Sequence, residues 1–253
     1  MPASLTAEID QQPAGDSTLK ALTFGNESGV TLIEDKVFEG CTFEGTSLRD
    51  TEIRGCRFDD CRFLAAQFDS ATLADTVFTR CLFYDEANET GSSFRFASFP
   101  GCRFEDSNLT LCDLSRADLY NAVFHRCQMT GINCEHATCS HVIGRQVVIR
   151  GLELSDCNLA YANLEGVDLG EADLTGSRLS HAIIARADLT DAVLNDCDLH
   201  GIEADGVTIR GADLRGATIS GLDVRDIDMT GVQVSPEQLP DLLAPLGIVI
   251  LPP

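Results

Sequence analysis

A large apolar residue recurs every five positions over most of the chain, and this period restricts the fold more than any other feature. We call these positions the centres; they run through residues 38–83, 94–129 and 149–234, with a lapse at Ala204. A small residue, usually Ala or Cys, stands two places before most centres. A period of five fits neither an α-helix nor a long alternating strand. It predicts short extended segments with two inward side chains and then a corner, stacked as a solenoid.

The clearest units are 172–176 (ADLTG) and 212–216 (ADLRG). They resemble the A(D/N)LXX units of pentapeptide-repeat proteins, and the resemblance covers residues 32–234. It implies an all-β solenoid, namely a right-handed quadrilateral β-helix with four pentapeptides in each coil. With about 4.8 Å between stacked strands, such a rod is on the order of 50 Å long.

Composition limits the partners of this solenoid. The formal charge is −22, from 40 acidic and 18 basic residues, so direct contact with nucleic acid or an anionic membrane is not expected, whereas a basic partner surface is favoured. The first thirty residues have no secretory pattern, and the apolar segment 242–251 is too short to span a bilayer. All 11 Cys residues fall on inward positions, which predicts buried thiols and a reducing, cytoplasmic location.

Neither catalysis nor metal binding is predicted. The sequence has no nucleophile elbow, phosphate-binding loop, zinc-protease motif or dinucleotide fingerprint, so we expect no enzyme and no cofactor. Residues of the types that bind zinc do lie close together between Cys134 and His141. The repeat directs Cys134 and Cys139 inward but His136 and His141 outward. These four side chains therefore cannot converge on one ion.

Two segments depart from the repeat in the N-terminal half. Residues 1–31 lack the period and are predicted to form a flexible acidic tail. Residues 84–91 add one residue to the five-residue frame within the 32–234 solenoid. This interruption is either a surface bulge or a loop that contacts a partner through Asp85, Glu86 and Glu89.

Residues 235–253 form a third departure. Ser235 to Gln238 matches a capping box with Pro at the first helical position, which predicts a short C-terminal helix followed by an apolar strand. This module either caps the open end of the solenoid or joins two chains. A similar terminal helix and strand pairs chains end to end in the MfpA and Qnr group, so the resemblance favours a homodimer. The residues expected at its interface are Leu239, Leu242, Leu243, Leu246, Ile248 and Ile250.

Acidic side chains are the main indication of function. Those directly before a centre belong to the repeat consensus, where Asp or Asn satisfies backbone groups of the turn, but other acids exceed it. Twenty-residue coils align several carboxylates in columns with one charge per ~4.8 Å, comparable with about 3.4 Å between phosphates on one DNA strand. The predicted partner-binding residues are Glu153, Asp168, Asp173, Asp188, Asp198, Asp213, Asp223 and Asp228.

The resemblance to the MfpA and Qnr group implies a specific function. Dimers of that group are understood to mimic duplex DNA and to bind type II topoisomerases, mainly DNA gyrase. By this resemblance, the chain is a dimeric acidic DNA mimic that inhibits gyrase or protects it from quinolone-type poisons, and so contributes to antibiotic resistance. The alternative is a pentapeptide-repeat scaffold with another partner. We expect one modest interruption here, rather than large projecting loops.

Overall fold

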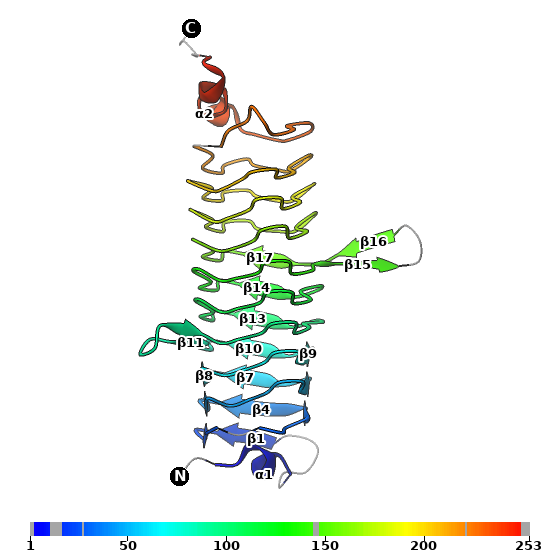
Figure 1. Cartoon of the computed structure of the whole chain (residues 1–253), viewed down its shortest axis with the longest axis vertical. Coiled ribbons are helices and arrows are strands. Elements are labelled where there is room, and N and C mark those ends of the chain that lie inside the picture. The colour runs from blue at the N-terminus through cyan, green and yellow to red at the C-terminus, as the bar shows by residue number, and fades with distance from the viewer. Residues whose placement is uncertain (1–2, 11–16, 27, 144–146, 221, 249–253) are drawn as a thin grey trace.

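The chain forms a rod of stacked coils in the computed structural model (Figure 1). The structure describes residues 3–10, 17–26, 28–143, 147–220 and 222–248. Residues in neighbouring coils are mostly twenty apart, as where Val37 lies beside Arg57 in a parallel pair. Twenty residues hold four units of five, so each coil has four sides. The predicted β-solenoid is confirmed.

The centres form one inward-facing column on each of four faces, buried along most of its length, and we number the faces in chain order. Face 1 carries the column from Leu19 to Val234, face 2 that from Phe24 to Ile219, face 3 that from Leu48 to Val224, and face 4 that from Ile33 to Met229.

Parallel strands occupy three of these faces. Face 1 holds β1 (Ser17–Lys20), β4 (Lys36–Glu39), β7 (Arg57–Asp59), β10 (Val77–Thr79), β13 (Arg103–Glu105), β14 (Val123–His125) and β17 (Glu153–Ser155). Face 2 holds β2 (Thr23–Phe24), β5 (Thr42–Glu44) and β8 (Arg62–Leu64), and face 4 holds β3 (Leu32–Glu34), β6 (Glu52–Arg54) and β9 (Thr72–Ala74). Beyond β17 the same register continues through single bridges.

Stacked Phe rings fill the N-terminal half of the rod. On face 1 the ring centroids of Phe38 and Phe58 are 4.7 Å apart, and those of Phe58 and Phe78 are 4.8 Å apart. On face 2 the rings of Phe43 and Phe63 lie 4.6 Å apart. This spacing matches the distance between paired strands, so each coil contributes one ring to each stack. Leu replaces Phe at most centres of the C-terminal half.

Small polar side chains two places before the centres join neighbouring coils. The thiol of Cys61 donates to the Phe38 carbonyl at 3.4 Å, and that of Cys197 donates to the Leu174 carbonyl at 3.0 Å. Ser177 occupies the same column, where its hydroxyl donates to a carbonyl of the coil below. All eleven Cys residues are buried and free, as the repeat predicts.

Many corners are closed by an Asp or Asn side chain, and most of them hold a left-handed residue. The Asp188 Oδ1 accepts the Thr190 N–H at 2.9 Å, and the Asn163 Oδ1 accepts the Glu165 N–H at 3.1 Å. Asp and Asn therefore make the same corner bond, which accounts for their place in the repeat. At most corners the residue two after the centre has positive φ, for example 72° at Gly211.

The solenoid begins earlier than the sequence predicts. A short helix, α1 (Leu5–Asp10), lies at the N-terminal end, and β1 and β2 pair with β4 and β5. Leu19 and Phe24 are buried in the core. The described parts of residues 1–31 therefore form a cap and a first coil rather than a flexible tail. Leu19 lies beside Phe38, nineteen residues away, and this shortened coil does not follow the count of five.

The interruption predicted at 84–91 is an antiparallel hairpin of β11 (Tyr84–Asp85) and β12 (Thr90–Gly91). Gln67 pairs with Ser93, which is 26 residues away instead of twenty. The hairpin therefore adds six residues to its coil, at the corner between faces 2 and 3.

A second hairpin projects from the opposite side of the rod (Figure 1). It consists of β15 (Ser140–Ile143) and β16 (Val147–Arg150), and it leaves the corner between faces 4 and 1. Gln128 pairs with Asn158, so this coil holds thirty residues. The expectation of one modest interruption is therefore corrected. Ile149, counted as a centre, instead pairs with His141 within the hairpin.

A short helix covers the C-terminal end of the rod, as predicted. It comprises the 3-10 turn Pro236–Gln238, α2 (Leu239–Leu243) and the 3-10 turn Ala244–Leu246. The buried Gln238 amide donates to the carbonyls of Leu214 and Ala217, both at 2.7 Å. The predicted terminal strand, with Ile250, lies outside the described residues. None of the helices in the described ranges has the length and apolar character needed to cross a bilayer.

Candidate partner-binding surface

Carboxylates gather where face 4 meets face 1, directly C-terminal to the second hairpin. Asp168 lies beside Asp188 on face 4, and Glu153 lies beside Asp173 on face 1. Parallel pairing sets about 4.8 Å between such neighbours. We call this surface the acidic edge; it consists of Glu153, Asp168, Glu171, Asp173, Asp188 and Asp191. The sequence-predicted set did not include Glu171 and Asp191, which occupy the corner itself.

The other predicted residues lie elsewhere on the rod. Asp198 is on face 2 and Asp223 on face 3, whereas Asp213 and Asp228 lie farther along faces 1 and 4. Val193 interrupts the face 1 column between Asp173 and Asp213, as the twenty-residue period predicts. The eight predicted residues are thus distributed over all four faces, and four of them lie in the acidic edge.

Arginines neutralise five of the eight predicted residues. These ion pairs are Asp168–Arg150, Asp198–Arg178, Asp213–Arg215, Asp223–Arg225 and Asp228–Arg210. Within the described ranges, no ion pair involves Glu153, Asp173 or Asp188 of the predicted set, nor Asp191. The negative charge of the acidic edge is therefore concentrated on these four residues.

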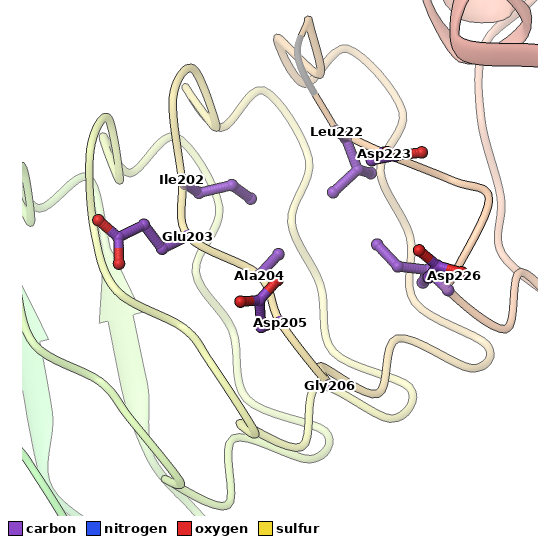
Figure 2. Close-up of a pocket in the computed structure, with 9 residues that line it drawn as sticks. Ile202, Glu203, Ala204, Asp205, Gly206, Leu222, Asp223 and Asp226 are labelled. Carbon is purple, nitrogen blue, oxygen red and sulfur yellow. The ribbon is translucent and has the colours of Figure 1, made fainter.

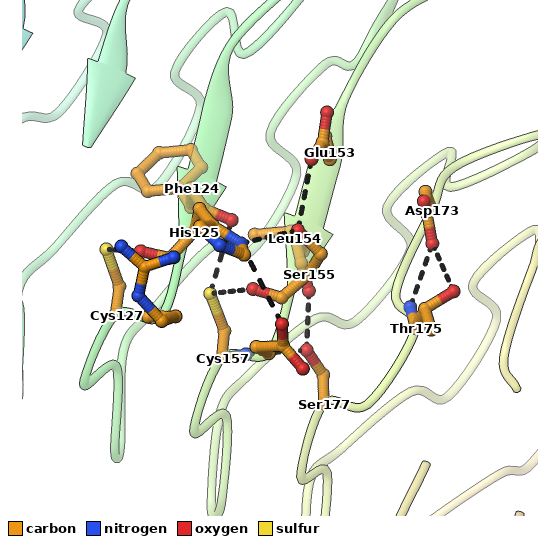
Figure 3. A network of polar contacts seen from close by, with 12 residues as sticks. Phe124, His125, Cys127, Glu153, Leu154, Ser155, Cys157, Asp173, Thr175 and Ser177 are labelled. Atoms are coloured by element: carbon orange, nitrogen blue, oxygen red, sulfur yellow. Dashed lines mark hydrogen bonds and ion pairs between the residues drawn. The ribbon is translucent and has the colours of Figure 1, made fainter. Parts of the chain in front are cut away.

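The free carboxylates also shape the backbone. The Asp173 Oδ1 accepts the Thr175 N–H at 2.9 Å and the Thr175 hydroxyl at 2.6 Å (Figure 3). Asp188 binds Thr190 in the same way. One oxygen of each Asp closes the corner, while the second makes no other hydrogen bond or ion pair in the described part of the chain. A change that removes the first oxygen would therefore alter structure as well as charge.

His125, Ser155 and two carboxylates meet next to this surface (Figure 3). The Ser155 Oγ lies 3.0 Å from the His125 Nδ1 and 3.0 Å from the Glu153 Oε1, while the Asp156 Oδ2 lies 4.0 Å from the same His nitrogen. In a Ser-His-acid triad the acid orients the His through the ring nitrogen opposite the Ser. Here Ser155 and Asp156 share one ring nitrogen, so the contacts join two coils rather than activate Ser155.

The second hairpin is anchored on the acidic edge. The Arg150 Nε lies 3.3 Å from the Asp168 Oδ1, and its Nη1 lies 3.1 Å from the Glu171 Oε1. His141 stacks on Tyr120, with ring centroids 4.3 Å apart. Beyond this base the hairpin leaves Val142 and Val148 67% and 43% exposed. An apolar projection therefore stands beside an anionic surface.

The first hairpin offers a partner fewer free carboxylates than the sequence predicts, although Asp85 stays ionised. The two oxygens of Asp85 accept the Asn88 side-chain amide at 2.7 Å and the Ala87 N–H at 3.0 Å, and the Asn88 bond lowers the pKa of Asp85. Asp85 thus holds the turn in shape. Glu86 and Glu89 are exposed, and they are the carboxylates available to a partner.

The predicted dimer residues divide between the rod and solvent. Leu242 is buried and Leu243 is half-buried. Leu239, Leu246 and Ile248 are 40%, 49% and 50% exposed. The helix therefore covers the rod with one side and leaves apolar side chains on the other.

The Cys–His segment does not form a metal cluster in the described ranges, where no group of three or more His, Cys, Asp or Glu side chains is placed to hold an ion. Cys134 and Cys139 are buried, whereas His141 contacts Asp118 outside the rod at 2.9 Å.

Comparison with known proteins first gives the family. The model of pentapeptide repeats matches eight copies, at residues 37–63, 90–126, 153–191 and 192–231, which together exceed half of the chain. The gaps between the first three segments contain β11 of the first hairpin and both strands of the second hairpin, whereas β12 lies at the start of the second segment. No curated protein sequence matches significantly.

Solved structures share the fold. Full-length QnrB1, a plasmid-mediated fluoroquinolone resistance protein, matches with a TM-score of 0.74 and 21% identity over 92% of this chain and 100% of QnrB1. HetL, a pentapeptide repeat protein involved in heterocyst differentiation regulation in the cyanobacterium Nostoc sp. strain PCC 7120, matches with a TM-score of 0.58 and 20% identity over 86% of this chain and 96% of HetL. The repeat model, the four-faced coils and these likenesses agree: the chain belongs to the pentapeptide-repeat family.

Proposed function

We propose that the acidic edge binds a basic protein surface that otherwise holds duplex DNA, and that the partner is a type II topoisomerase, DNA gyrase. The protein acts by binding, in the cytoplasm, and either inhibits the enzyme or protects it from quinolone-type poisons. The supporting observation is the register of Glu153 with Asp173 and of Asp168 with Asp188. It repeats negative charge at a spacing near that of DNA phosphates on a stiff rod.

The fold and the projecting hairpin add support. The likeness to QnrB1 extends over nearly the whole rod, and QnrB1 is a fluoroquinolone resistance protein. The hairpin of β15 and β16 lies beside the acidic edge, so a partner that covers this edge would also meet Val142 and Val148. Apolar contacts of this kind give an anionic surface a preferred orientation on its partner.

We further propose that two chains pair through the C-terminal module. Leu239, Leu246 and Ile248 leave an apolar surface uncovered at the end of the rod. A two-fold dimer would bury it on both chains and place the two rods end to end.

A gyrase supercoiling assay tests the partner. Purified protein should inhibit supercoiling, or restore it in the presence of a quinolone, at micromolar concentration. The variant Asp173→Asn/Asp188→Asn/Asp191→Asn should weaken binding about tenfold or more and reduce the salt dependence of binding. Asn keeps the corner bond, as Asn163 shows, so the variant should remain folded.

The control removes three charges from other faces. The variant Glu44→Gln/Asp50→Asn/Asp196→Asn removes as many negative charges as the acidic-edge variant does, and it should bind gyrase nearly as well as the parent. Equal losses in the two triple variants would show that net charge, not the acidic edge, governs binding. Failure of the parent to bind or affect gyrase would reject this partner.

Light scattering tests the dimer. Leu246→Ser/Ile248→Ser should yield monomers with an unchanged circular dichroism spectrum, because both side chains are half exposed in one chain. Gln238→Ala is the contrasting variant, since it should lower stability by leaving two carbonyls without their amide donor. A parent that is monomeric at micromolar concentration contradicts the dimer.

A scaffold with a different partner is the second candidate function. Arginine pairing at five of the eight predicted carboxylates favours it, because these pairs lower the anionic character of faces 2 and 3. HetL shows that this fold also occurs in a protein of developmental regulation. Unaltered gyrase activity, together with capture of a different basic protein that the acidic-edge variant fails to capture, would support it.

A further inference from the structure

A cleft of about 350 Å³ opens on face 3 between the last two coils (Figure 2). Residues 202–206 form its lower rim, on the side nearer the N-terminal end of the rod, and residues 222, 223, 226 and 227 form its upper rim. It lies away from the acidic edge, and the proposed function does not use it.

The sequence explains why the coils separate here. Ile202 and Leu222 stand two places before a centre, in the column where the preceding coils carry Ala162 and Ala182. A single large side chain fits this column, since the buried Ile132 lies between Cys112 and Ala162, but two that follow each other directly increase the distance between their coils. The centre of the lower coil is Ala204, the lapse in the repeat, so a methyl group stands where a Leu or Ile would fill the space.

The backbone ladder is open at the same place. Lower on face 3, the Leu164 N–H donates to the Ile183 carbonyl and the Ile184 N–H donates to the Glu203 carbonyl, both at 2.8 Å. Among the described residues, no backbone hydrogen bond joins 202–206 to 222–227. Both rims therefore present backbone donors and acceptors to the cleft. Such open edges bind extended peptides by strand addition.

The negative charge of the two rims favours a peptide with basic side chains. Glu203, Asp205 and Asp226 line the cleft, and none of them forms an ion pair within the described ranges. Asp223 also lines it and is paired with Arg225. Ile202 and Leu222 supply an apolar floor. A volume of this size lies at the lower end of ligand sites, which suits a few residues of a peptide.

We propose that this cleft binds a short extended segment of a partner protein in which basic side chains alternate with apolar ones. The segment lies between the two coils, pairs its backbone with both rims, places apolar side chains on Ile202 and Leu222, and places basic side chains at Glu203, Asp205 and Asp226.

Titration calorimetry of the full chain with acetyl-Val-Lys-Val-Lys-Val-Lys-amide tests the site. Ala204→Leu should weaken binding about tenfold or more, because the side chain fills the cleft. Glu203→Gln/Asp226→Asn should weaken it about fivefold at low salt. The same peptide with Glu in place of Lys should not bind, and methylation of its backbone nitrogens should abolish binding.

Asp50→Asn/Asp196→Asn removes the same charge outside both the cleft and the acidic edge and should leave binding within about twofold. Equal weakening by this control, or binding unchanged in Ala204→Leu, would show only general attraction to an acidic rod and overturn the proposal. No binding by the parent would also overturn it. If Ala204→Leu does not fold, the Glu203→Gln/Asp226→Asn comparison decides. A failure of the protein to bind gyrase would not affect this peptide-binding test, because the acidic edge lies where face 4 meets face 1 and the cleft opens on face 3.

Discussion

At the scale of single residues, the Asp before a centre serves both structure and charge. Asp213 shows this best because it is buried while its carboxylate pairs with Arg215. The bond from the Arg215 guanidinium lowers the pKa of Asp213 from 3.8 to about 2. Because the pKa of Asp213 is lower in the folded than in the unfolded chain, the ionised carboxylate stabilises the folded protein at pH values above about 4. This stabilisation is lost as pH falls from about 4 to about 2.

We expect Asp213→Asn to lower the free energy of unfolding by about 1 kcal/mol at pH 7, since the corner bond survives but the ion pair does not. The difference from the parent should vanish as pH approaches 2. Urea denaturation at several pH values measures it. Asp223→Asn is the matched control, because the same Arg pair there is exposed and should contribute less. A pH-independent difference would contradict the assignment to charge.

Several corners hold a side chain in the left-handed region that Gly prefers. Ala65 has φ of 52°, is exposed, and lies on the corner between faces 2 and 3. We expect Ala65→Gly to stabilise the protein by about 0.5 kcal/mol, because relief of strain exceeds the added entropy of the unfolded chain. Thermal unfolding measures the change. Ala182→Gly, at a buried inward position, should destabilise instead; the same sign for both would contradict this account.

At the scale of elements, insertions are tolerated only where they preserve the coil register. The first hairpin adds six residues, as the pairing of Gln67 with Ser93 shows. Deletion of residues 85–90 should therefore restore a twenty-residue coil and leave a cooperative unfolding transition. Deletion of 85–89 leaves one extra residue in the coil. It should lower the melting temperature more than the deletion of 85–90 does, because the next strand would turn its buried side chains outward. Equal melting temperatures for the two deletions would contradict this.

The period of five predicted the rod, its core and its corners, because each unit carries the same two inward side chains. It missed the second hairpin for an arithmetical reason. The hairpin inserts ten residues, which are two units of five, so Leu154 and the later centres keep the five-residue spacing. Ile149 matches that spacing only by coincidence. The first coil was missed for the opposite reason, since its nineteen residues shift Leu19 out of frame.

The candidate surface was only half predictable. The register of Asp168 with Asp188 follows from twenty-residue coils. The neutralising partners do not, because Arg150 reaches Asp168 from a hairpin and Arg210 reaches Asp228 across a coil boundary. These contacts depend on insertions and rotamers that a sequence period does not encode. The cleft had a signal in the lapse at Ala204, but its size depends on Ile202 and Leu222 stacking across two coils.

At the scale of the molecule, each coil contacts only its neighbours, so stability varies along the rod. Hydrogen exchange should be slowest in the Phe-filled coils around β7 and β10, where these two strands are each paired on both sides. It should be fastest in residues 222–228, where backbone bonds to the preceding coil are missing in the described structure. Exchange measured by mass spectrometry checks this gradient. Uniform protection along the chain would contradict it.

The burial of all eleven thiols has a practical consequence. Burial raises the pKa of Cys112, and it raises that of Cys134 to about 12, so little thiolate forms there to react with an alkylating reagent. A cysteine introduced at Glu86 or Val142 would be the accessible one while the rod stays folded. A fluorophore can therefore be attached to either hairpin without first replacing the native cysteines. Dyes on both hairpins would report the distance across the width of the rod when a partner binds.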